Sequence, residues 1–322
     1  MNCPKVAVII PFFQRERGIL SKAIESVLKQ KNIHNFEIII IDDGSPVSAH
    51  DELAGLINAN KSFIRAIKQE NRGPAAARNR GLDTVSKDTA YVAFLDSDDQ
   101  WSDAHLENAV FALEKGYDFY FADYARNYGN YRENSFTSWF HPLDYLIISK
   151  ERNLYEFSGD LFNKLLGGTF IKTSTVVYRY GKNKNLRFPE EFIVGEDLVF
   201  FLGYLFLSKK AVFSSEVECL AGKGINIYGE PEWGSGKQLN LICDMMRVYK
   251  SIGKSFTLDF KQRQRLRKKI KYLRYEFAES LLHGIKCASK IRANTIFKQF
   301  KADPFTFIEL LPNILKIAKT KL

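Results

Sequence analysis

The sequence predicts an α/β protein with a mostly parallel sheet flanked by helices and a helical, basic C-terminal appendage. Three observations support this prediction. Short β-branched and aromatic runs alternate with helix-like segments over the first 125 residues, acidic clusters follow two of those runs, and positive charge gathers in residues 250–322. Strands covered by helices on both faces are apolar along nearly their whole length, and these runs are of that kind.

Five runs in this region predict strands, and the segments between them predict helices. The strands are KVAVII (5–10), FEIIIID (36–42), FIRAIK (63–68), AYVAFLD (90–96) and YDFYFAD (117–123). Residues 21–30 place Ala23, Ile24, Val27 and Leu28 on one helical face, and residues 105–115 do the same with Leu106, Val110 and Leu113. Residues 71–81 predict a turn and then an alanine-rich helix with Pro74 in its first turn.

The pattern changes after residue 125. Aromatic and Asn-rich loops lead to TFIKTSTVVYRYG (169–181), which predicts a strand, and residues 194–213 predict a helix opened by two acids and then a strand. A Gly-rich loop with Trp233 precedes a helical remainder. There, apolar residues repeat at helical spacing beside a basic face formed by Lys261, Arg263, Arg265, Lys268, Lys269 and Arg274.

Composition limits the class of protein. The 322 residues are 45% hydrophobic, enough for one large domain or a domain with an appendage. The four cysteines show no CxxC spacing, which argues against a zinc cluster or disulfide framework and favours a reducing compartment. The longest apolar stretch, residues 198–207, is about half of the roughly 20 residues that span a bilayer. We therefore expect neither a membrane span nor a secretory signal.

The net charge of +10 is unevenly distributed. Residues 250–322 hold 18 Lys and Arg against 5 Asp and Glu, or 18 − 5 = +13, which leaves 10 − 13 = −3 for residues 1–249. A basic tail on a nearly neutral body suggests an anionic partner, either a membrane surface or a nucleic acid.

Acidic residues follow the second and fourth predicted strands. Asp42 and Asp43 end the second, and Asp96, Asp98 and Asp99 end the fourth. Ligands bind at the carboxyl ends of parallel strands, and Mg²⁺ and Mn²⁺ prefer carboxylate and diphosphate oxygens. The clusters therefore predict a cation site, with a solvated turn as the alternative.

The segment between the two clusters suggests a phosphate contact. The free amides of the helix that starts near Pro74, with Arg72, Arg78 and Arg80, have the chemistry for it, although an arginine such as Arg78 is as often solvated. GxGxxG and GxxxxGK[ST] loops are absent, which argues against a dehydrogenase and an ATPase. A nucleoside diphosphate held through a metal ion, as in nucleotide-sugar transfer, fits the pattern better.

Four motifs in order, VIIPFFQRERGILSKAIESVLKQ, IIIIDDGSP, NRGPAAARNRGLD and FLDSDDQW, resemble the family 2 glycosyltransferases with the GT-A fold. The resemblance covers roughly the first 125 residues. It implies a nucleotide-sugar donor, a divalent cation, Mn²⁺ or Mg²⁺, and inversion at the anomeric carbon. It also implies a nucleotide-sugar-binding half at 1–125, an acceptor-binding and catalytic-base half at 126–235, and a helical basic region at 236–322.

The resemblance assigns nucleotide-sugar contacts by position. Asp43, with Asp42 beside it, resembles the uracil-contacting acid, and Pro11 begins the loop that lies over the nucleotide. Asn71 and Arg78 belong to the motif that contacts the nucleotide-sugar.

The resemblance also assigns the metal and catalytic roles. Asp96 resembles the ribose- or metal-proximal acid of the DxD motif, and Asp98 resembles the direct metal ligand. Asp197 of the GED segment resembles the general base, with Glu196 as the alternative, while a helix N-terminus favours acids there in any case. Trp233 is a candidate for stacking on the acceptor sugar or for simple packing.

A narrower resemblance concerns the substrates. PFFQRERGILSKAIESV, GEDLVFF and GKGINIY are similar to bacterial glucosyltransferases that build succinoglycan-type exopolysaccharide and O-antigen repeat units. This implies UDP-glucose as donor and an undecaprenyl diphosphate-linked acceptor such as N-acetylglucosamine, with a β-1,3 link. Galactose or an N-acetylhexosamine is the alternative donor sugar. The QxxRW motif of processive relatives is absent, which favours a single addition.

Three hypotheses follow for the whole chain. The first is a glycosyltransferase that is cytoplasmic and peripheral on the inner face of the bacterial inner membrane, where its basic tail meets anionic lipid at ~1 kcal/mol per basic residue. The tail folded on the domain with its charges in water is the alternative. The second is a nucleic-acid-binding protein, which residues 261–277 fit weakly, so no nucleic-acid partner is expected. The third is an inactive sugar-nucleotide-binding protein, against which the intact DxD and GED segments argue.

Overall fold

The computed structural model of the chain describes residues 4–59, 63–128, 131–134, 139, 141–222, 234–287 and 293–320. The chain forms two compact units. The first contains residues 1–191 and 200–225, and the second contains residues 192–199 and 226–322.

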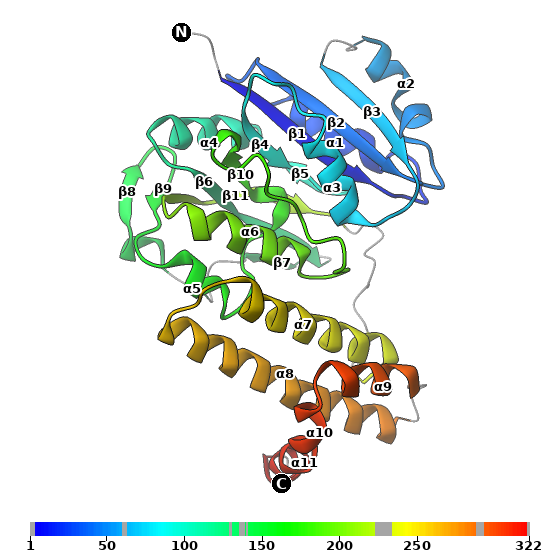
Figure 1. Ribbon diagram of the computed structural model, residues 1–322. Coiled ribbons are helices and arrows are strands. Elements are labelled where there is room, and N and C mark those ends of the chain that lie inside the picture. The colour runs from blue at the N-terminus through cyan, green and yellow to red at the C-terminus, as the bar shows by residue number, and fades with distance from the viewer. Residues whose placement is uncertain are drawn as a thin grey trace. The chain divides into compact units, whose positions relative to one another are not determined.

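The first unit is built on a mixed sheet in the order β3-β2-β1-β4-β10-β6-β11-β9-β8, with β5 paired to β11 and β7 paired to β6 (Figure 1). Its strands are β1 (Lys5–Phe12), β2 (Phe36–Asp43), β3 (Ile64–Gln69), β4 (Thr89–Phe94), β5 (Gln100–Trp101), β6 (Phe119–Tyr128), β7 (Tyr131–Asn134), β8 (Leu146–Ser149), β9 (Leu154–Glu156), β10 (Val177–Arg179) and β11 (Ala211–Ala221). β1 to β4 are mutually parallel, as are β6 and β11, and the other pairs are antiparallel.

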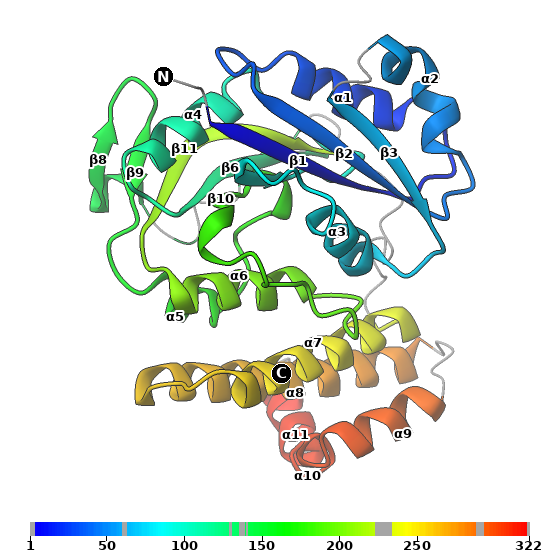
Figure 2. The same ribbon diagram turned by 45° about the horizontal axis from the view of Figure 1, so that its top comes forward.

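Helices flank both faces of this sheet. They are α1 (Ile19–Leu28), α2 (Ala49–Ala59), α3 (Pro74–Leu82), α4 (His105–Glu114), α5 (Leu161–Leu165) and α6 (Glu196–Leu207), which begins in the second unit and continues into the first. The alternation along β1 decides which helix packs where. Val6, Val8 and Ile10 join the cluster that buries the apolar faces of α1 and α4, whereas Ile9 points to the other face, where α3 lies (Figure 2). Gly81 allows this approach, because a Cβ there would overlap the Ile9 side chain.

An aromatic cluster supports the end of β4. The ring of Phe94 packs edge-on against Phe188 and Phe200, whose own rings stack with centroids 4.0 Å apart, and Tyr178 of β10 completes the cluster. All four side chains are at most 1% exposed. The last residue of β4 is thus held rigidly, just before the acidic segment 96–99.

Two local predictions need correction. The strand expected over residues 169–181 is only Val177–Arg179, because Thr173–Thr175 form a 3₁₀ turn in which the Thr175 hydroxyl donates to the Lys172 carbonyl oxygen. The sequence also suggests a surface or capping role for His105, because it has no partner nearby in the chain, and this expectation is wrong. Its ring is fully buried, and Nδ1 lies 2.8 Å from the Glu218 carboxylate, which Asn108 and Tyr120 also contact.

The second unit is helical. It contains α7 (Gly236–Ser255), α8 (Phe260–Lys286), α9 (Ala293–Ala302), α10 (Phe305–Ile308) and α11 (Leu310–Thr320). The side chains of Ser235 and Asp259 cap α7 and α8, the latter through a reciprocal capping box with Gln262. Leu266, Leu273 and Phe277 are buried, as their helical spacing predicts. In the described part of the chain, no helix is both long and apolar enough to cross a membrane.

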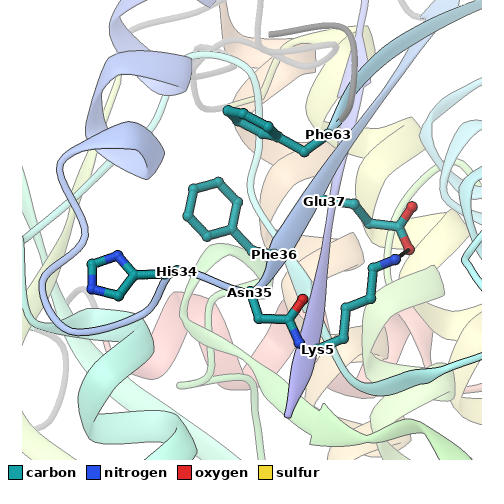
Figure 3. Close-up of a pocket in the computed structure, with 6 residues that line it drawn as sticks. All are labelled: Lys5, His34, Asn35, Phe36, Glu37 and Phe63. Atoms are coloured by element: carbon teal, nitrogen blue, oxygen red, sulfur yellow. Dashed lines mark ion pairs between the residues drawn. The ribbon is translucent and has the colours of Figure 1, made fainter. Parts of the chain in front are cut away.

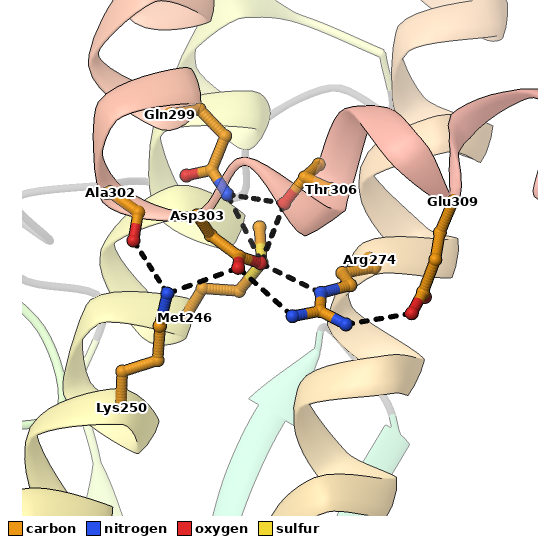
Figure 4. A network of polar contacts seen from close by, with 8 residues as sticks. All are labelled: Met246, Lys250, Arg274, Gln299, Ala302, Asp303, Thr306 and Glu309. Carbon is orange, nitrogen blue, oxygen red and sulfur yellow. Dashed lines mark hydrogen bonds and ion pairs between the residues drawn. The ribbon is translucent and has the colours of Figure 1, made fainter.

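A buried polar network joins α7 and α8 to the turn between α9 and α10 (Figure 4). Asp303 is fully buried and accepts from Lys250 of α7, from Arg274 of α8 and from the Thr306 hydroxyl. Arg274 also donates to Glu309 at 2.8 Å. Arg274, which the sequence places on a basic face of α8, is instead mostly buried, and its guanidinium pairs with acids of the C-terminal helices.

Candidate functional site

The carboxyl ends of three neighbouring parallel strands place two acidic segments at one edge of the sheet. β1 lies between β2 and β4, with Phe12 opposite Asp42 and Ile9 opposite Phe94. Pro11 pairs with Ile41 at the end of β1. The segments that carry Asp42, Asp43 and Asp96 to Asp99 thus leave the sheet on the same side, where ligands of parallel sheets bind.

The Asp42 carboxylate accepts hydrogen bonds from backbone amides of the loop that follows it. Its Oδ1 accepts from the Ser45 amide at 2.8 Å, and its Oδ2 accepts from the Ala49 amide, the first of α2, at 2.9 Å. The carboxylate is nearly fully buried. In the first unit as it stands, Asp42 shapes the turn after β2 and begins α2.

Asp43 joins the turn before α3 to the end of β2. Its carboxylate accepts from the Gln69 side chain at 2.7 Å and from the amides of Arg72 and Gly73 at 2.9 and 2.8 Å. The Asn71 side chain donates to the Asp43 carbonyl oxygen at 2.9 Å. Two of the amides that the sequence offers to phosphate therefore already have an acceptor, and Asp43 and Asn71 come together as one structural group.

Two cationic side chains from distant parts of the sequence form ion pairs with the segment 96–99. The Arg78 guanidinium of α3 is buried and lies 2.8 Å from Asp96 Oδ1, so it is not solvated. Lys172 Nζ lies 2.8 Å from Asp99 Oδ2 and 3.7 Å from Asp96 Oδ2. These charges hold the pKa of Asp96 below its usual value against the effect of burial.

Asp99 is a structural acid. It is 1% exposed, and besides Lys172 it accepts from the Ser174 hydroxyl and from the Gly222 amide, the latter at 2.9 Å. The Ser174 oxygen in turn accepts from the Asp96 amide at 3.0 Å. Asp99 therefore connects the acidic segment to the turn before β10 and to the end of β11.

Asp98 differs from its neighbours. Among the residues that the structure describes, it has no Lys or Arg within ion-pair distance, and it is only partly buried. Burial and the charges of Asp99 and Asp96 raise the pKa of Asp98 to about 6. A carboxylate that is costly to ionise and has no cation of its own suits a metal ligand.

The donor set fits a hard divalent cation. In the described ranges, no three His, Cys, Asp or Glu side chains gather in metal-binding geometry. Mg²⁺ and Mn²⁺ in nucleotide sites commonly use one or two carboxylates and take their remaining ligands from water and phosphate. Asp98 and one oxygen of Asp96 offer such a sparse set of carboxylate oxygens.

Asp197 and Glu196 belong to the second unit, where they open α6. Glu196 is buried, whereas Asp197 is partly exposed and its Oδ1 accepts from the Leu198 amide at 2.7 Å. Gly195 precedes them with φ = +74°, and a Cβ there would lie 3.2 Å from Val248 of α7. The turn that presents Asp197 thus depends on glycine. Trp233 lies outside the described residues.

Three residues that contact the Asp99 carboxylate, Lys172, Ser174 and Gly222, were not predicted from the sequence. The available signal was weak, a single lysine within an otherwise apolar and β-branched stretch. Nor was Gln14 predicted, whose side chain donates to the Ser97 hydroxyl at 3.1 Å and joins the loop after β1 to the acidic segment.

A separate hollow of about 250 Å³ lies at the opposite edge of the sheet (Figure 3). The lining residues lie just before or within the first two positions of β1, β2 and β3, and they are Lys5, His34, Asn35, Phe36, Glu37 and Phe63. Because these are the amino ends of the strands, the hollow is not part of the acidic site.

The family model described as Glycosyl transferase family 2 matches residues 7–187, more than half of the chain. The chain belongs to this family. It is 33% identical over 226 residues to the succinoglycan biosynthesis protein ExoW of Rhizobium meliloti, a match that covers 70% of each chain. It is also 31% identical over 219 residues to the minor teichoic acid biosynthesis protein GgaA of Bacillus subtilis, over 63% of this chain and 44% of that one.

Solved structures agree on the fold. S. aureus TarS 1-349 has a TM-score of 0.57 with 17% identity, covering 96% of this chain and 81% of that one. The mannosyltransferase PcManGT from Pyrobaculum calidifontis, in complex with GDP-Man and Mn²⁺, has a TM-score of 0.56 with 12% identity, covering 98% and 86%. The glycosyltransferase thus has the GT-A fold, with a helical C-terminal region, as the sequence predicts.

A substitution of Gly222 should disturb the acidic segment without touching its charges. A Cβ at position 222 would overlap the Asp98 carbonyl oxygen, and the Gly222 amide holds Asp99. We expect Gly222→Ala to displace Asp98 and to lower kcat/KM for transfer by on the order of 100-fold, because misplaced catalytic groups lose about that factor. Gly55→Ala in α2, where a Cβ meets no atom within 4 Å, is the matched control. Unchanged kinetics for Gly222→Ala would contradict the close approach.

Proposed function

We propose that this family 2 glycosyltransferase is inverting and metal-dependent, and moves glucose from UDP-glucose to a lipid-linked sugar such as undecaprenyl diphosphate-linked N-acetylglucosamine. The β-1,3 link and the biosynthesis of bacterial O-antigen or exopolysaccharide are parts of the proposal. One observation carries it, the acidic segment at the carboxyl ends of the parallel strands with Asp98 lacking a cationic partner in the described chain. Similarity to a succinoglycan and a teichoic acid biosynthesis protein supports the class of product.

In this proposal the donor binds to residues 1–125. Asp43 and Asp42 with Pro11 form the uracil end, and Asn71 and Arg78 lie toward the rest of the nucleotide-sugar. Because Asp42 and Asp43 are buried and bonded to backbone amides, they would act largely by fixing the loops that the nucleotide contacts.

Asp98, with Asp96, would hold Mn²⁺ or Mg²⁺. When bound, the cation supplies positive charge that offsets the negative charge of the departing diphosphate. Burial opposes ionisation of Asp96, but Arg78 and Lys172 favour the ionised form, and the net effect lowers the pKa of Asp96.

Asp197 is the proposed base in the acceptor-binding half, residues 126–235. The acceptor hydroxyl oxygen forms a bond to the anomeric carbon as the bond from that carbon to the diphosphate oxygen breaks. The hydroxyl proton passes to the Asp197 carboxylate. Asp197 suits this role better than Glu196, because Glu196 is buried and Asp197 is partly exposed. Trp233 remains a proposed acceptor contact.

A donor panel tests the substrates. Wild-type enzyme with Mn²⁺ is given UDP-glucose, UDP-galactose or a UDP-N-acetylhexosamine together with a synthetic lipid-diphosphate N-acetylglucosamine, and the product linkage is read by NMR. We expect the highest turnover with UDP-glucose and a β-1,3 product. Preference for galactose or an N-acetylhexosamine would retain the class of reaction and replace the donor, while an α-linked product would contradict inversion.

The C-terminal helices carry the surface proposed to meet the anionic membrane. Six apolar side chains of the region 293–320 are each more than half exposed, namely Phe297, Phe300, Phe305, Ile308, Leu311 and Leu315. Four exposed lysines lie among them, Lys298, Lys301, Lys316 and Lys319. Apolar side chains flanked by lysines are typical of helices that lie in the headgroup region of an anionic leaflet.

Charge favours lipid over a second copy of the chain on this surface. The acids of residues 293–320, Asp303 and Glu309, are already paired with Arg274, so the lysines dominate (Figure 4). A two-fold interface would place these lysines against their own copies, whereas anionic headgroups complement them. We therefore place the proposed enzyme at the cytoplasmic face of the inner membrane as a peripheral protein.

Vesicle sedimentation checks this surface. We expect the triple variant Ile308→Ser, Leu311→Ser, Leu315→Ser to lose more than about tenfold in binding to phosphatidylglycerol vesicles, since each side chain gains roughly 1.5 kcal/mol or more on leaving water. Leu143→Ser with Leu207→Ser, exposed apolar residues of the first unit at 72% and 67%, is the control. Equal sedimentation of the triple variant would reject the membrane surface, and tight duplex DNA binding by the wild type would favour the nucleic-acid alternative.

A further inference from the structure

Lys172 occupies an unusual place for a lysine in a site that is proposed to bind a divalent cation. Its ammonium group lies within ion-pair distance of two of the three acids of the segment 96–99, and the side chain is 20% exposed. It reaches this position from the turn before β10, a part of the chain that none of the recognised motifs includes.

We propose that Lys172 is a positioning residue, an internal counter-ion that holds Asp96 and Asp99 and thereby makes divalent-cation binding depend on the nucleotide diphosphate. The inference rests on the proposed metal role of Asp98 and concerns the order of binding. It assigns the lysine a function that differs from contact with the sugar or the acceptor.

The hydrogen bonds of Asp99 show that Lys172 is part of the folded framework. One oxygen of Asp99 accepts from Lys172 and Ser174, and the other accepts from Gly222. All three donors come from segments more than 70 positions away in the chain, so contacts within the protein hold Asp99 and the acidic segment.

The charge balance then disfavours the cation alone. The three carboxylates and the two cations Arg78 and Lys172 sum to −3 + 2 = −1, centred on Asp98. A divalent ion at Asp98 would gain little net attraction and would be repelled by the nearby ammonium group. A nucleoside diphosphate brings further negative charge and several oxygen atoms. These oxygens would supply ligands that the Asp98 carboxylate alone cannot give to the divalent ion.

The test measures Mn²⁺ binding directly by electron paramagnetic resonance of free Mn²⁺, with and without UDP. We expect wild-type enzyme to bind Mn²⁺ weakly alone and much more tightly with UDP. Lys172→Met, which keeps most of the unbranched stem of the side chain and removes its charge, should strengthen nucleotide-free Mn²⁺ binding by on the order of tenfold, the size of one nearby charge acting on a divalent ion. Lys172→Arg keeps the charge and should behave as wild type.

Two further variants separate this role from general effects on the fold. Lys182→Met removes another lysine that pairs with a buried acid, Asp118 at 2.8 Å, away from the acidic segment, and should leave Mn²⁺ binding unchanged. Lys172→Gln retains a donor for Asp99 if the methionine variant fails to fold, and should also strengthen nucleotide-free binding. Melting curves establish that each variant is folded.

The contrary outcomes are distinct. Tight Mn²⁺ binding by the wild type without UDP, or unchanged binding by folded Lys172→Met and Lys172→Gln, would overturn the counter-ion role and leave the metal assignment intact. Loss of UDP binding by these variants at saturating Mn²⁺ would assign Lys172 to the nucleotide instead. Absence of Mn²⁺ binding even with UDP would overturn both this inference and the proposed metal site.

Discussion

Asp98→Asn should abolish metal-dependent transfer and leave the enzyme folded. Asp98 is the acid of the segment 96–99 that no cation neutralises in the described chain, so its loss removes the main proposed ligand without breaking an ion pair. Steady-state transfer from the UDP-sugar and Mn²⁺ titration in the presence of UDP measure the effect. We expect turnover to fall by on the order of 100- to 1,000-fold, the range that loss of charge stabilisation in a transition state produces.

The same variant should not lower stability. The pKa of Asp98 is raised from 3.8 to about 6, which means that the folded state disfavours the ionised form. Between about pH 4 and pH 6 the Asp98 carboxyl loses its proton more readily in the unfolded chain than in the folded one, so the free energy of unfolding falls as the pH rises through this range. Above pH 6 the ionised carboxylate opposes folding in full. Asp98→Asn removes that contribution, so its melting temperature at pH 7.5 without cation should equal or exceed that of the wild type.

Two controls define this result. Asp103→Asn removes an exposed acid of the neighbouring loop, which pairs with Lys31, and should leave both transfer and melting unchanged. Asp99→Asn should lower the melting temperature, because an amide nitrogen replaces one of the two oxygens that accept from Lys172, Ser174 and Gly222, which leaves a buried donor without an acceptor. Wild-type turnover of Asp98→Asn with Mn²⁺ would refute the metal assignment.

Asp197→Asn should stop transfer while UDP-sugar binding persists. The amide cannot accept the proton of the acceptor hydroxyl, and general base catalysis contributes about 10² to 10⁴-fold to a rate. The substitution keeps the shape of the side chain and an oxygen for the Leu198 amide, so α6 should still begin correctly. Turnover and calorimetric UDP binding, measured on the same preparation, separate catalysis from donor binding.

Glu196→Gln is the matched control for this prediction, because it makes the same chemical change at the neighbouring, buried position. We expect it to retain transfer. If Glu196→Gln loses activity while Asp197→Asn keeps it, the two acids exchange roles. If both retain full turnover, the GED segment does not supply the base.

Much of the fold could be predicted from the sequence because its signals are local. The runs at β1, β2 and β4 are apolar over nearly every position, and only a sheet covered on both faces buries such strands. Asp43 ends β2, and Asp96 comes two residues after β4. Because both strands are parallel to β1, the two acids lie at the same edge of the sheet. The caps and apolar spacing of α8 are local in the same sense.

The surroundings of the acids depend on contacts between residues far apart in the sequence. Lys172 and Gly222 lie 73 and 123 positions from Asp99, and nothing in their own neighbourhoods indicates that they hold it. Periodicity reports which face of an element is buried but not which partner meets it there. For the same reason the sequence does not indicate the pairing of Arg274 with Asp303, which lies 29 positions further along the chain.

The sequence by itself determined the strand and helix alternation, the family resemblance and the positions of the acids. The tertiary structure decided which of these acids are neutralised. Asp96 and Asp99 look equivalent to Asp98 in the motif, yet Arg78 and Lys172 form ion pairs with the first two, and the described chain offers the third no such partner. Charge interactions depend on distance in space and on burial, and neither is set until the chain has folded.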